Sequence, residues 1–219
     1  MGKVSSRFQQ VGAMTRKDHV VLVSGLHTQE YADAEIVLSY PSLAFLFSRK
    51  LAGKIEEWRP RLTFDVVVGA EHGGAYVGFL VAATYAHMTG SKARFVIARK
   101  QKSGRFIFDK ADARFLRGKR ALLVDDVVSE GTTFRRAGEA LRRVGATVVA
   151  GAVWLNRSRY SNPKRLGVPA LVALEQYPLR TWAPGECRRS GPCSKSVPIN
   201  TTIGHGKEFL ARQAAHKRP

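Results

Sequence analysis

The sequence predicts an α/β fold with a mostly parallel sheet flanked by helices. Short apolar segments of strand length alternate with helix-length segments through the middle of the chain, and this alternation is typical of βαβ units. The chain has 219 residues, of which 44% are hydrophobic, enough to bury one full core. Its longest apolar runs are strand-sized, far below the ~20 residues of a membrane helix. We therefore expect one globular domain with appendages.

The first half of the chain supplies the first strands and helices. Residues 19–24 (HVVLVS) form a short apolar strand, and residues 41–58 have apolar side chains at helical spacing. Residues 63–69 predict a buried strand. A glycine pair then turns the chain, and residues 75–88 have the length and composition of a buried helix.

The second half continues the same alternation. Residues 93–98 predict a strand, and residues 101–108 form a mobile basic loop or hairpin. Residues 120–128 predict another apolar strand. The helix that follows has Phe134, Ala137, Leu141 and Val144 at helical spacing, and Gly145 ends it. Two further strands are expected at residues 147–155 and 171–174.

Two appendages flank the predicted domain of residues 19–176. Residues 1–18 are polar and are expected to be mobile. Residues 177–219 are rich in Pro, Gly and Cys and are expected to form a loosely structured extension. The N-terminus lacks the apolar stretch of a secretory signal, and the chain has only two cysteines. We therefore expect a reducing, cytoplasmic setting.

The strong positive charge predicts an anionic partner. The formal net charge is +19 at pH 7, which creates a field that attracts anions. A nucleic acid, a nucleotide and a polyphosphate would each satisfy it. A solvated basic surface with no partner would give the same count.

The ends of three predicted strands, at Gly69, Arg99 and Asp125, should lie at one edge of the sheet. In parallel sheets the ligand crevice lies beyond this edge. After the third strand, Asp125 and Asp126 precede a loop of small polar residues, and a loop of this kind before a helix binds phosphate. Carboxylates beside such a loop suit sugar hydroxyls or a Mg²⁺-bound ligand.

Other sequence patterns leave few alternatives for the aspartate pair. A Walker B strand would need a G-x-x-x-x-G-K-[ST] motif, and a nicotinamide dehydrogenase would need G-x-G-x-x-G; the sequence contains neither. The aspartates could instead only cap the following turn. A purely structural role therefore stays open at this point.

The segment VDDVVSEGTT resembles the 5-phosphoribosyl-1-pyrophosphate (PRPP) signature of the type I phosphoribosyltransferases. The resemblance implies that Asp125 and Asp126 hydrogen-bond the ribose hydroxyls. It also implies that the following loop binds the 5′-phosphate. The implied phosphate-binding residues are Val127, Val128, Ser129, Glu130, Gly131, Thr132 and Thr133.

Further segments resemble the orotate phosphoribosyltransferases, over about residues 20–200. SGLHTQEYAD resembles the base-binding hood of that family, VVVGAEHGG its pyrophosphate loop, IARKQK its basic strand end, and WLNRS the strand that carries an arginine for the orotate carboxylate. The tail from WAPGEC onward resembles a C-terminal extension of some members. The resemblance implies pyrophosphate contacts by Glu71, His72 and Gly73, leaving-group contacts by Arg99, Lys100 and Lys102, and base contacts by Tyr31, Ser129 and Arg157.

The chain also departs from the orotate pattern. Val23 stands where a lysine usually precedes SG, and the loop after Lys100 has no histidine. The pyrophosphate loop lacks the usual lysine unless His72 substitutes. The resemblance implies a Mg²⁺-dependent, homodimeric enzyme that joins orotate to PRPP. A purine or uracil phosphoribosyltransferase, or a PRPP-sensing nucleic-acid regulator without turnover, remains an alternative.

Several candidate residues also have ordinary structural explanations. Arg99 and Lys100 could be a solvated pair, and Arg157 could pair with a structural carboxylate. Cys187 and Cys193 are separated by five residues, unlike the two of a C-x-x-C knuckle, and His205 lies nearby as a third ligand. They are weak zinc candidates, with free thiols or a structural clip as the alternatives.

Overall fold

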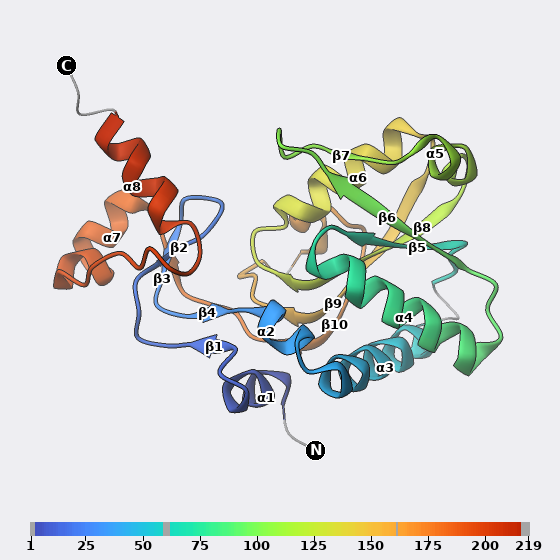
Figure 1. Ribbon diagram of the computed structural model, residues 1–219, viewed down its shortest axis with the longest axis horizontal. Helices are drawn as coiled ribbons and strands as arrows, with labels where there is room; N and C mark the ends of the chain where they lie inside the picture. The colour runs from blue at the N-terminus through green and yellow to red at the C-terminus, as the bar shows by residue number, and fades with distance from the viewer. Residues whose placement is uncertain (1–2, 59–61, 161, 216–219) are drawn as a thin grey trace.

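The computed structural model describes residues 3–58, 62–160 and 162–215, and a six-stranded sheet forms its centre (Figure 1). The strand order is β10-β9-β8-β5-β6-β7. Every neighbouring pair is parallel except β6 and β7. The strands are β5 (Val66–Ala70), β6 (Arg94–Lys100), β7 (Phe106–Ile107), β8 (Arg120–Val128), β9 (Thr147–Asn156) and β10 (Leu171–Gln176).

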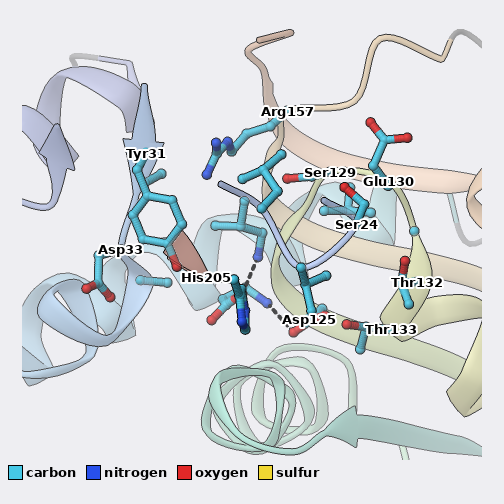
Figure 2. Close-up of a pocket in the computed structure, with 18 of the residues that line it drawn as sticks. Ser24, Tyr31, Asp33, Asp125, Ser129, Glu130, Thr132, Thr133, Arg157 and His205 are labelled. Atoms are coloured by element: carbon cyan, nitrogen blue, oxygen red, sulfur yellow. Dashed lines mark hydrogen bonds between the residues drawn. The ribbon is translucent and has the colours of Figure 1, made fainter. Parts of the chain in front are cut away.

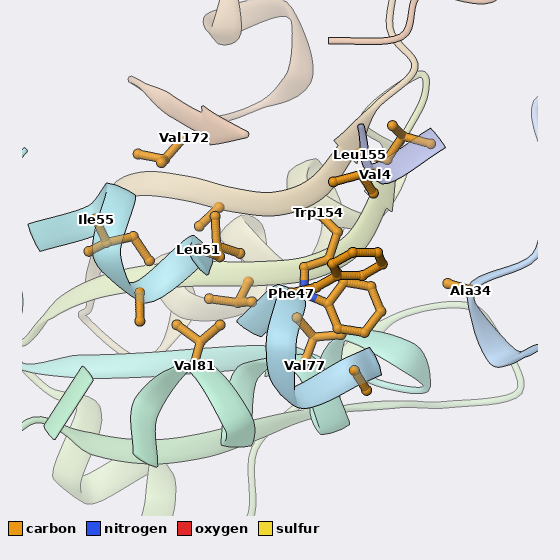
Figure 3. Packing of buried hydrophobic residues seen from close by; sticks show 14 of the residues in the cluster. Val4, Ala34, Phe47, Leu51, Ile55, Val77, Val81, Trp154, Leu155 and Val172 are labelled. Carbon is orange, nitrogen blue, oxygen red and sulfur yellow. The ribbon is translucent and has the colours of Figure 1, made fainter. Parts of the chain in front are cut away.

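Helices cover both faces of this sheet, as the sequence predicts. Because successive strand residues point to opposite faces, Val67 and Leu122 join one core while Val66 and Leu123 join the other. The first core lies under α3 (Pro41–Glu57) and α4 (Gly73–Thr89), where the ring of Phe47 meets Trp154 edge-on (Figure 3). The second lies under α5 (Lys110–Leu116) and α6 (Thr132–Arg143).

The predicted strand and helix alternation is confirmed, with bounds that shift by a few residues. The strand at 120–128 is found as expected. The basic segment after Lys100 forms the turn of a hairpin, in which Arg99 pairs with Ile107. The strand expected at 19–24 is shorter, and only β2 (Val20–Val21) is regular. No helix in the described ranges is both long and apolar enough to cross a membrane.

The described part of the N-terminal segment, from residue 3 onward, contains regular structure, unlike the mobile segment expected at residues 1–18. It contains α1 (Val4–Gln10) and β1 (Met14–Thr15). Val4 and Phe8 are four residues apart, so they share one helix face, and both are buried in the first core. Phe8 stacks on Phe47 with ring centroids 6.2 Å apart. These two apolar side chains therefore help to dock a segment that is otherwise polar.

Removal of the Ser5 hydroxyl tests this docking. The backbone N–H of Ser5 donates to Glu175 of β10 (2.9 Å), and its Oγ donates to the same carboxylate (2.6 Å). We expect Ser5→Ala to lower the free energy of unfolding by about 1–2 kcal/mol, because one hydrogen bond to a charged group is lost. Ser6→Ala, at the exposed neighbouring position, is the control and should change stability little. Equal unfolding midpoints in urea would contradict the docking.

A separate group of short elements lies at one end of the sheet and forms a hood. It contains α2 (Ala34–Leu38), the β1-β4 pair with β4 (Tyr31–Ala32), and a three-stranded sheet in the order β11-β3-β2. In the latter, β11 (Thr181–Trp182) comes from the C-terminal extension and pairs with β3 (His27–Thr28).

The C-terminal extension has more structure than the sequence predicts. We expected an irregular segment, but it contains α7 (Pro184–Ser190), a 3₁₀ turn at Pro192–Lys195 and α8 (Gly206–Ala215), all packed beside the hood (Figure 1). A second 3₁₀ turn, Pro163–Leu166, follows β9. The tertiary partners that order the extension lie in the N-terminal hood, far away in the sequence.

Candidate functional site

A pocket of about 360 Å³ lies beyond the carboxyl end of β8, between the sheet and the hood (Figure 2). Its position is the one expected of a ligand site in a parallel sheet. The predicted ribose, phosphate and base residues all line it. The lining residues are Leu22, Val23, Ser24, Tyr31, Ala32, Asp33, Ala34, Glu35, Asp125, Asp126, Val127, Val128, Ser129, Glu130, Gly131, Thr132, Thr133, Arg157 and His205.

The two aspartates, Asp125 and Asp126, are adjacent residues near the carboxyl end of β8, and both line the pocket. Asp125 accepts a hydrogen bond from the N–H of Asp126 (3.0 Å), and Asp126 accepts one from the N–H of Val127 (2.5 Å). Burial, and then the charge of Asp126, raise the pKa of Asp125 well above its ordinary value. Burial likewise raises the pKa of Asp126 to about 6. Such closely placed acceptors suit two adjacent hydroxyl groups.

The loop between β5 and α4 packs directly on the aspartates. A Cβ on Gly73 would collide with the Asp126 carboxylate, and a Cβ on Gly74 would lie 2.7 Å from Asp125 Oδ1. The preceding peptide bond, Glu71–His72, is cis. Any larger residue at the glycine pair would displace the carboxylates, so these glycines are needed for the geometry of the pair.

The loop from Ser129 to Thr133 places the start of α6 at the pocket. Gly131 has a left-handed conformation (φ 71°), and a Cβ there would lie 2.5 Å from the backbone of Leu166. Only glycine fits such a position. The loop and the Thr132 and Thr133 hydroxyls line the pocket. The first N–H groups of a helix have no partner within it, and the helix start carries partial positive charge. This arrangement favours a bound phosphate.

The Glu130 side chain does not compete with that anion. Tyr160 Oη donates to its carboxylate (2.9 Å), and Figure 2 shows the carboxylate directed away from Asp125. The Arg135 guanidinium, on the first turn of α6, donates to the Glu130 carbonyl (2.6 Å). These contacts hold the loop in place from its outer side.

Arg157 provides a buried cation in the pocket, and its guanidinium lies against the hood residues Glu30 and Tyr31. Arg157 is only 4% exposed. Its guanidinium donates a hydrogen bond to the Glu30 carbonyl (3.1 Å) and lies 5.5 Å from the centre of the Tyr31 ring. Burial lowers the pKa of Arg157 to about 10, so it stays charged at neutral pH. Its Nε has no hydrogen-bond partner among the described residues. A planar anionic group stacked near Tyr31 would satisfy it.

The predicted pyrophosphate residues lie beside the pocket and do not line it. Glu71 accepts a hydrogen bond from the backbone N–H of Lys100 (2.7 Å), and His72 and Arg99 are exposed. The Lys100 charge opposes the upward shift in the pKa of Asp125, so it acts on the site at a distance. Lys102 lies in the exposed turn of the β6–β7 hairpin. Their contacts with a ligand remain a prediction.

The pocket is also lined by residues that the sequence analysis did not assign to it. Asp33 caps α2 by accepting from the N–H of Glu35 (3.0 Å), and both carboxylates line the hood side. An Asp before a short apolar run is a detectable cap signal. His205 comes from the C-terminal extension, and no local pattern places it in the pocket. It lines this site, so the fold gives it a place other than beside the two cysteines.

The raised pKa values predict a pH dependence for ligand capture. Below about pH 6, Asp126 takes up a proton and loses acceptor capacity for hydroxyl groups. We expect the association constant of a ligand held through its hydroxyl groups to fall as the pH is lowered from about 7 to 5, approaching tenfold per unit below the pKa. Comparison with Asp126→Asn isolates this group, since the variant should have a flatter profile. Parallel profiles would show that Asp126 does not titrate in this range.

A family model for the phosphoribosyl transferase domain matches residues 34–168, a range that contains the aspartates and the phosphate loop. The chain is similar to an orotate phosphoribosyltransferase of Caldanaerobacter subterraneus, with 27% identity over 90% of this chain and 94% of the relative. It is 31% identical to orotate phosphoribosyltransferase 2 of Mesorhizobium japonicum, over 81% of this chain and 85% of the relative.

Solved structures support the same architecture. The chain resembles a crystal structure of orotate phosphoribosyltransferase from Francisella tularensis, with a TM-score of 0.56 and 14% sequence identity. The match includes 96% of this chain and 97% of the Francisella chain. The Mycobacterium tuberculosis orotate phosphoribosyltransferase in complex with PRPP covers 76% of this chain, and 91% of its own length is covered, with a TM-score of 0.54 and 20% identity. At these identities the similarity concerns the fold alone.

Proposed function

The chain belongs to the phosphoribosyltransferase family, and we propose from this premise that it joins orotate to C1′ of PRPP and releases pyrophosphate. The observation that carries the proposal is one pocket in which a carboxylate pair, a phosphate-type loop and a buried arginine face one another. These three features match the ribose hydroxyls, the 5′-phosphate and the carboxylate of orotate. The curated relatives named as orotate phosphoribosyltransferases support the choice of base.

In the proposed complex the protein positions the sugar phosphate before any bond breaks. Asp125 and Asp126 accept hydrogen bonds from the 2′- and 3′-hydroxyls. The N–H groups of residues 129–133 and the Thr132 and Thr133 hydroxyls donate to the 5′-phosphate. Holding both ends of the ribose fixes C1′ relative to the base. The carboxylates also stabilise positive charge as it develops at C1′.

The donor set also fits the Mg²⁺ that such a substrate carries. Hard carboxylate oxygens of Asp125 and Asp126 lie directly against the glycine pair of the pyrophosphate loop, and Mg²⁺ prefers oxygen ligands. When bound with PRPP, the ion supplies charge neutralisation for the leaving pyrophosphate. On the protein side, Lys100 and Arg99 at the end of β6 add positive charge, and the hairpin that carries Lys102 would exclude water.

Base selection falls to the side of the pocket formed by the hood and the end of β9. The Arg157 guanidinium would pair with the orotate carboxylate, and the Tyr31 ring would pack on the base. Ser129 could hydrogen-bond at the boundary between base and ribose. These roles do not require the lysine that this chain replaces by Val23, because Arg157 is a buried cation in its own right.

We further propose a homodimer in the cytoplasm. Large apolar side chains are exposed on the outer faces of α3 and α4, among them Phe45, Tyr76 and Phe79. Exposed apolar side chains of this size favour burial against a second copy. Cys187 and Cys193 are not joined by a disulfide, which agrees with a reducing compartment.

A base panel tests the proposed function. The purified chain is mixed with Mg²⁺ and PRPP, and pyrophosphate release is measured with orotate, uracil, adenine or guanine. We expect release with orotate and little with the other bases. Preference for a purine or for uracil would reassign the enzyme to salvage. Tight PRPP binding with no turnover on any base would support a sensor and reject the enzyme.

A further inference from the structure

Four side chains outside the pocket converge at the junction of the hood and the C-terminal extension. His19, His27, Cys187 and Cys193 each direct one ligand atom to a common point, and these four atoms lie within 4.8 Å of one another. Three of the four residues are buried and Cys193 is partly exposed. We propose that they form a structural zinc site that fastens the extension to the hood.

The distances within the cluster match a tetrahedral ion. The Cys193 Sγ lies 3.6 Å from both His19 Nε2 and His27 Nδ1, and the Cys187 Sγ lies 3.8 Å from His19 Nε2. With Zn–S of about 2.3 Å and Zn–N of about 2.0–2.1 Å, a tetrahedron places sulfur and nitrogen about 3.5 Å apart. The two nitrogens are 2.6 Å apart and would separate by less than about 1 Å to admit the ion.

The surroundings of the histidines prepare one of them for metal binding. His19 Nδ1 lies 2.7 Å from the carbonyl oxygen of Val197, to which it donates a hydrogen bond. The proton on Nδ1 leaves the Nε2 lone pair directed at the cluster. This arrangement, in which the second ring nitrogen donates to a carbonyl, is typical of histidines that bind zinc.

The donor types favour zinc over other ions. Two thiolates and two imidazoles form the Cys₂His₂ set of structural zinc sites. All four positions come from the protein, as in a closed structural site. Magnesium and calcium prefer oxygen ligands, and the cluster contains no carboxylate. Two thiolates would also balance the charge of one Zn²⁺.

The site would connect segments that are about 160 residues apart in the sequence. His19 directly precedes β2 and His27 lies in β3, whereas Cys187 lies in α7 and Cys193 in the 3₁₀ turn that follows it. Backbone hydrogen bonds continue this junction, from Asn200 N–H to the His19 carbonyl and from His205 N–H to the Val21 carbonyl (both 2.8 Å). Since His205 lines the substrate pocket, the ion would hold one edge of that pocket in place.

This assignment corrects the ligand set that the sequence suggested. The cysteines do converge, but His205 is not the histidine beside them. A disulfide is the main alternative, because the two sulfurs are close and the Cys193 N–H donates to the Cys187 sulfur (3.3 Å). A disulfide would involve only the two sulfurs, whereas zinc would use all four groups.

Elemental analysis of the full chain, purified under reducing conditions, tests the proposal directly. We expect one zinc per wild-type chain and loss of at least about nine-tenths of it in the Cys187→Ser/Cys193→Ser double variant. His205→Asn and His87→Asn are matched controls and should keep the metal; His87 is exposed on α4. Zinc that survives in the double variant, or is lost from His205→Asn, would overturn the assignment.

Cobalt substitution of the wild-type chain keeps the proposal testable if the double variant fails to fold. Co²⁺ in the site should give thiolate-to-metal absorption and the visible bands of a tetrahedral ion. Removal of the ion with a chelator should increase proteolysis within residues 177–215 at least about tenfold, since the extension loses its attachment. The site would be rejected if the wild-type chain is purified without metal and shows none of these absorption bands after Co²⁺ is added. A disulfide between the two cysteines, found by mass spectrometry, would also reject it. None of these measurements depends on which base the enzyme uses.

Discussion

Replacement of Asp126 by asparagine is expected to lower kcat/KM for PRPP about 100-fold. The carboxylate is a charged acceptor at the base of the pocket, and its hydrogen bonds to ribose hydroxyls are worth about 1.5–3 kcal/mol. Asparagine has nearly the same shape and can still accept from the Val127 N–H that Asp126 now binds. The loss would therefore reflect charge and acceptor capacity. Steady-state kinetics at pH 8 with varied PRPP measure it.

The same substitution should stabilise the fold. Burial raises the pKa of Asp126 to about 6, so the charged form opposes folding above that pH, by on the order of 2 kcal/mol. Asp126→Asn should raise the melting temperature by a few degrees at pH 8, with a gain that shrinks as the pH falls from 6 toward 4. Glu139→Gln, on the exposed face of α6, is the control for both effects. Lower stability together with unchanged kinetics would contradict a ligand-binding carboxylate.

Replacement of Arg157 by methionine is expected to lower kcat/KM for orotate by about 100- to 1000-fold. A buried charge pair that loses one partner costs about 2–5 kcal/mol in binding. Affinity for PRPP should change less than about threefold, because the Arg157 guanidinium contacts the hood residues Glu30 and Tyr31, on the proposed base side of the pocket. Kinetics with varied orotate at saturating PRPP, and calorimetry with PRPP alone, separate the two effects.

Arg159→Met provides the matched control for this experiment. Arg159 lies two residues further along and is exposed, so its loss should leave both substrates unaffected. If Arg157→Met and Arg159→Met behave alike, the buried guanidinium has no role in base binding. If the loss appears in PRPP binding, Arg157 contacts the sugar phosphate and the proposed arrangement of base and ribose is wrong.

The central sheet and the PRPP side of the pocket could be predicted from the sequence because their signals are local. An apolar strand, two aspartates and a Gly–Thr loop before an amphipathic helix occupy one continuous segment, and β8 and α6 form there. Parallel pairing then brings the ends of β5 and β8 together. Tyr31 and Arg157 followed from the resemblance to a family, and both line the pocket.

The structure of α1 and of the C-terminal extension could not be predicted because distant residues order it, whereas the hood was expected only through the resemblance to a family. Strand β11 has only two residues and is regular through its pairing with β3. Phe8 orders α1 through a core that lies mostly after residue 34. The histidines beside Cys187 and Cys193 are more than 150 residues upstream, whereas the nearest histidine in the sequence is His205.

The reverse reaction tests the central claim most directly, because it requires the ribose, phosphate and base sites at once. The wild-type chain is mixed with orotidine 5′-monophosphate, Mg²⁺ and pyrophosphate, and the products are separated by chromatography. The proposed function predicts orotate and PRPP in equal amounts, at a rate that Asp126→Asn and Arg157→Met both reduce. Intact orotidine 5′-monophosphate, under conditions in which the wild-type chain binds PRPP, would contradict it.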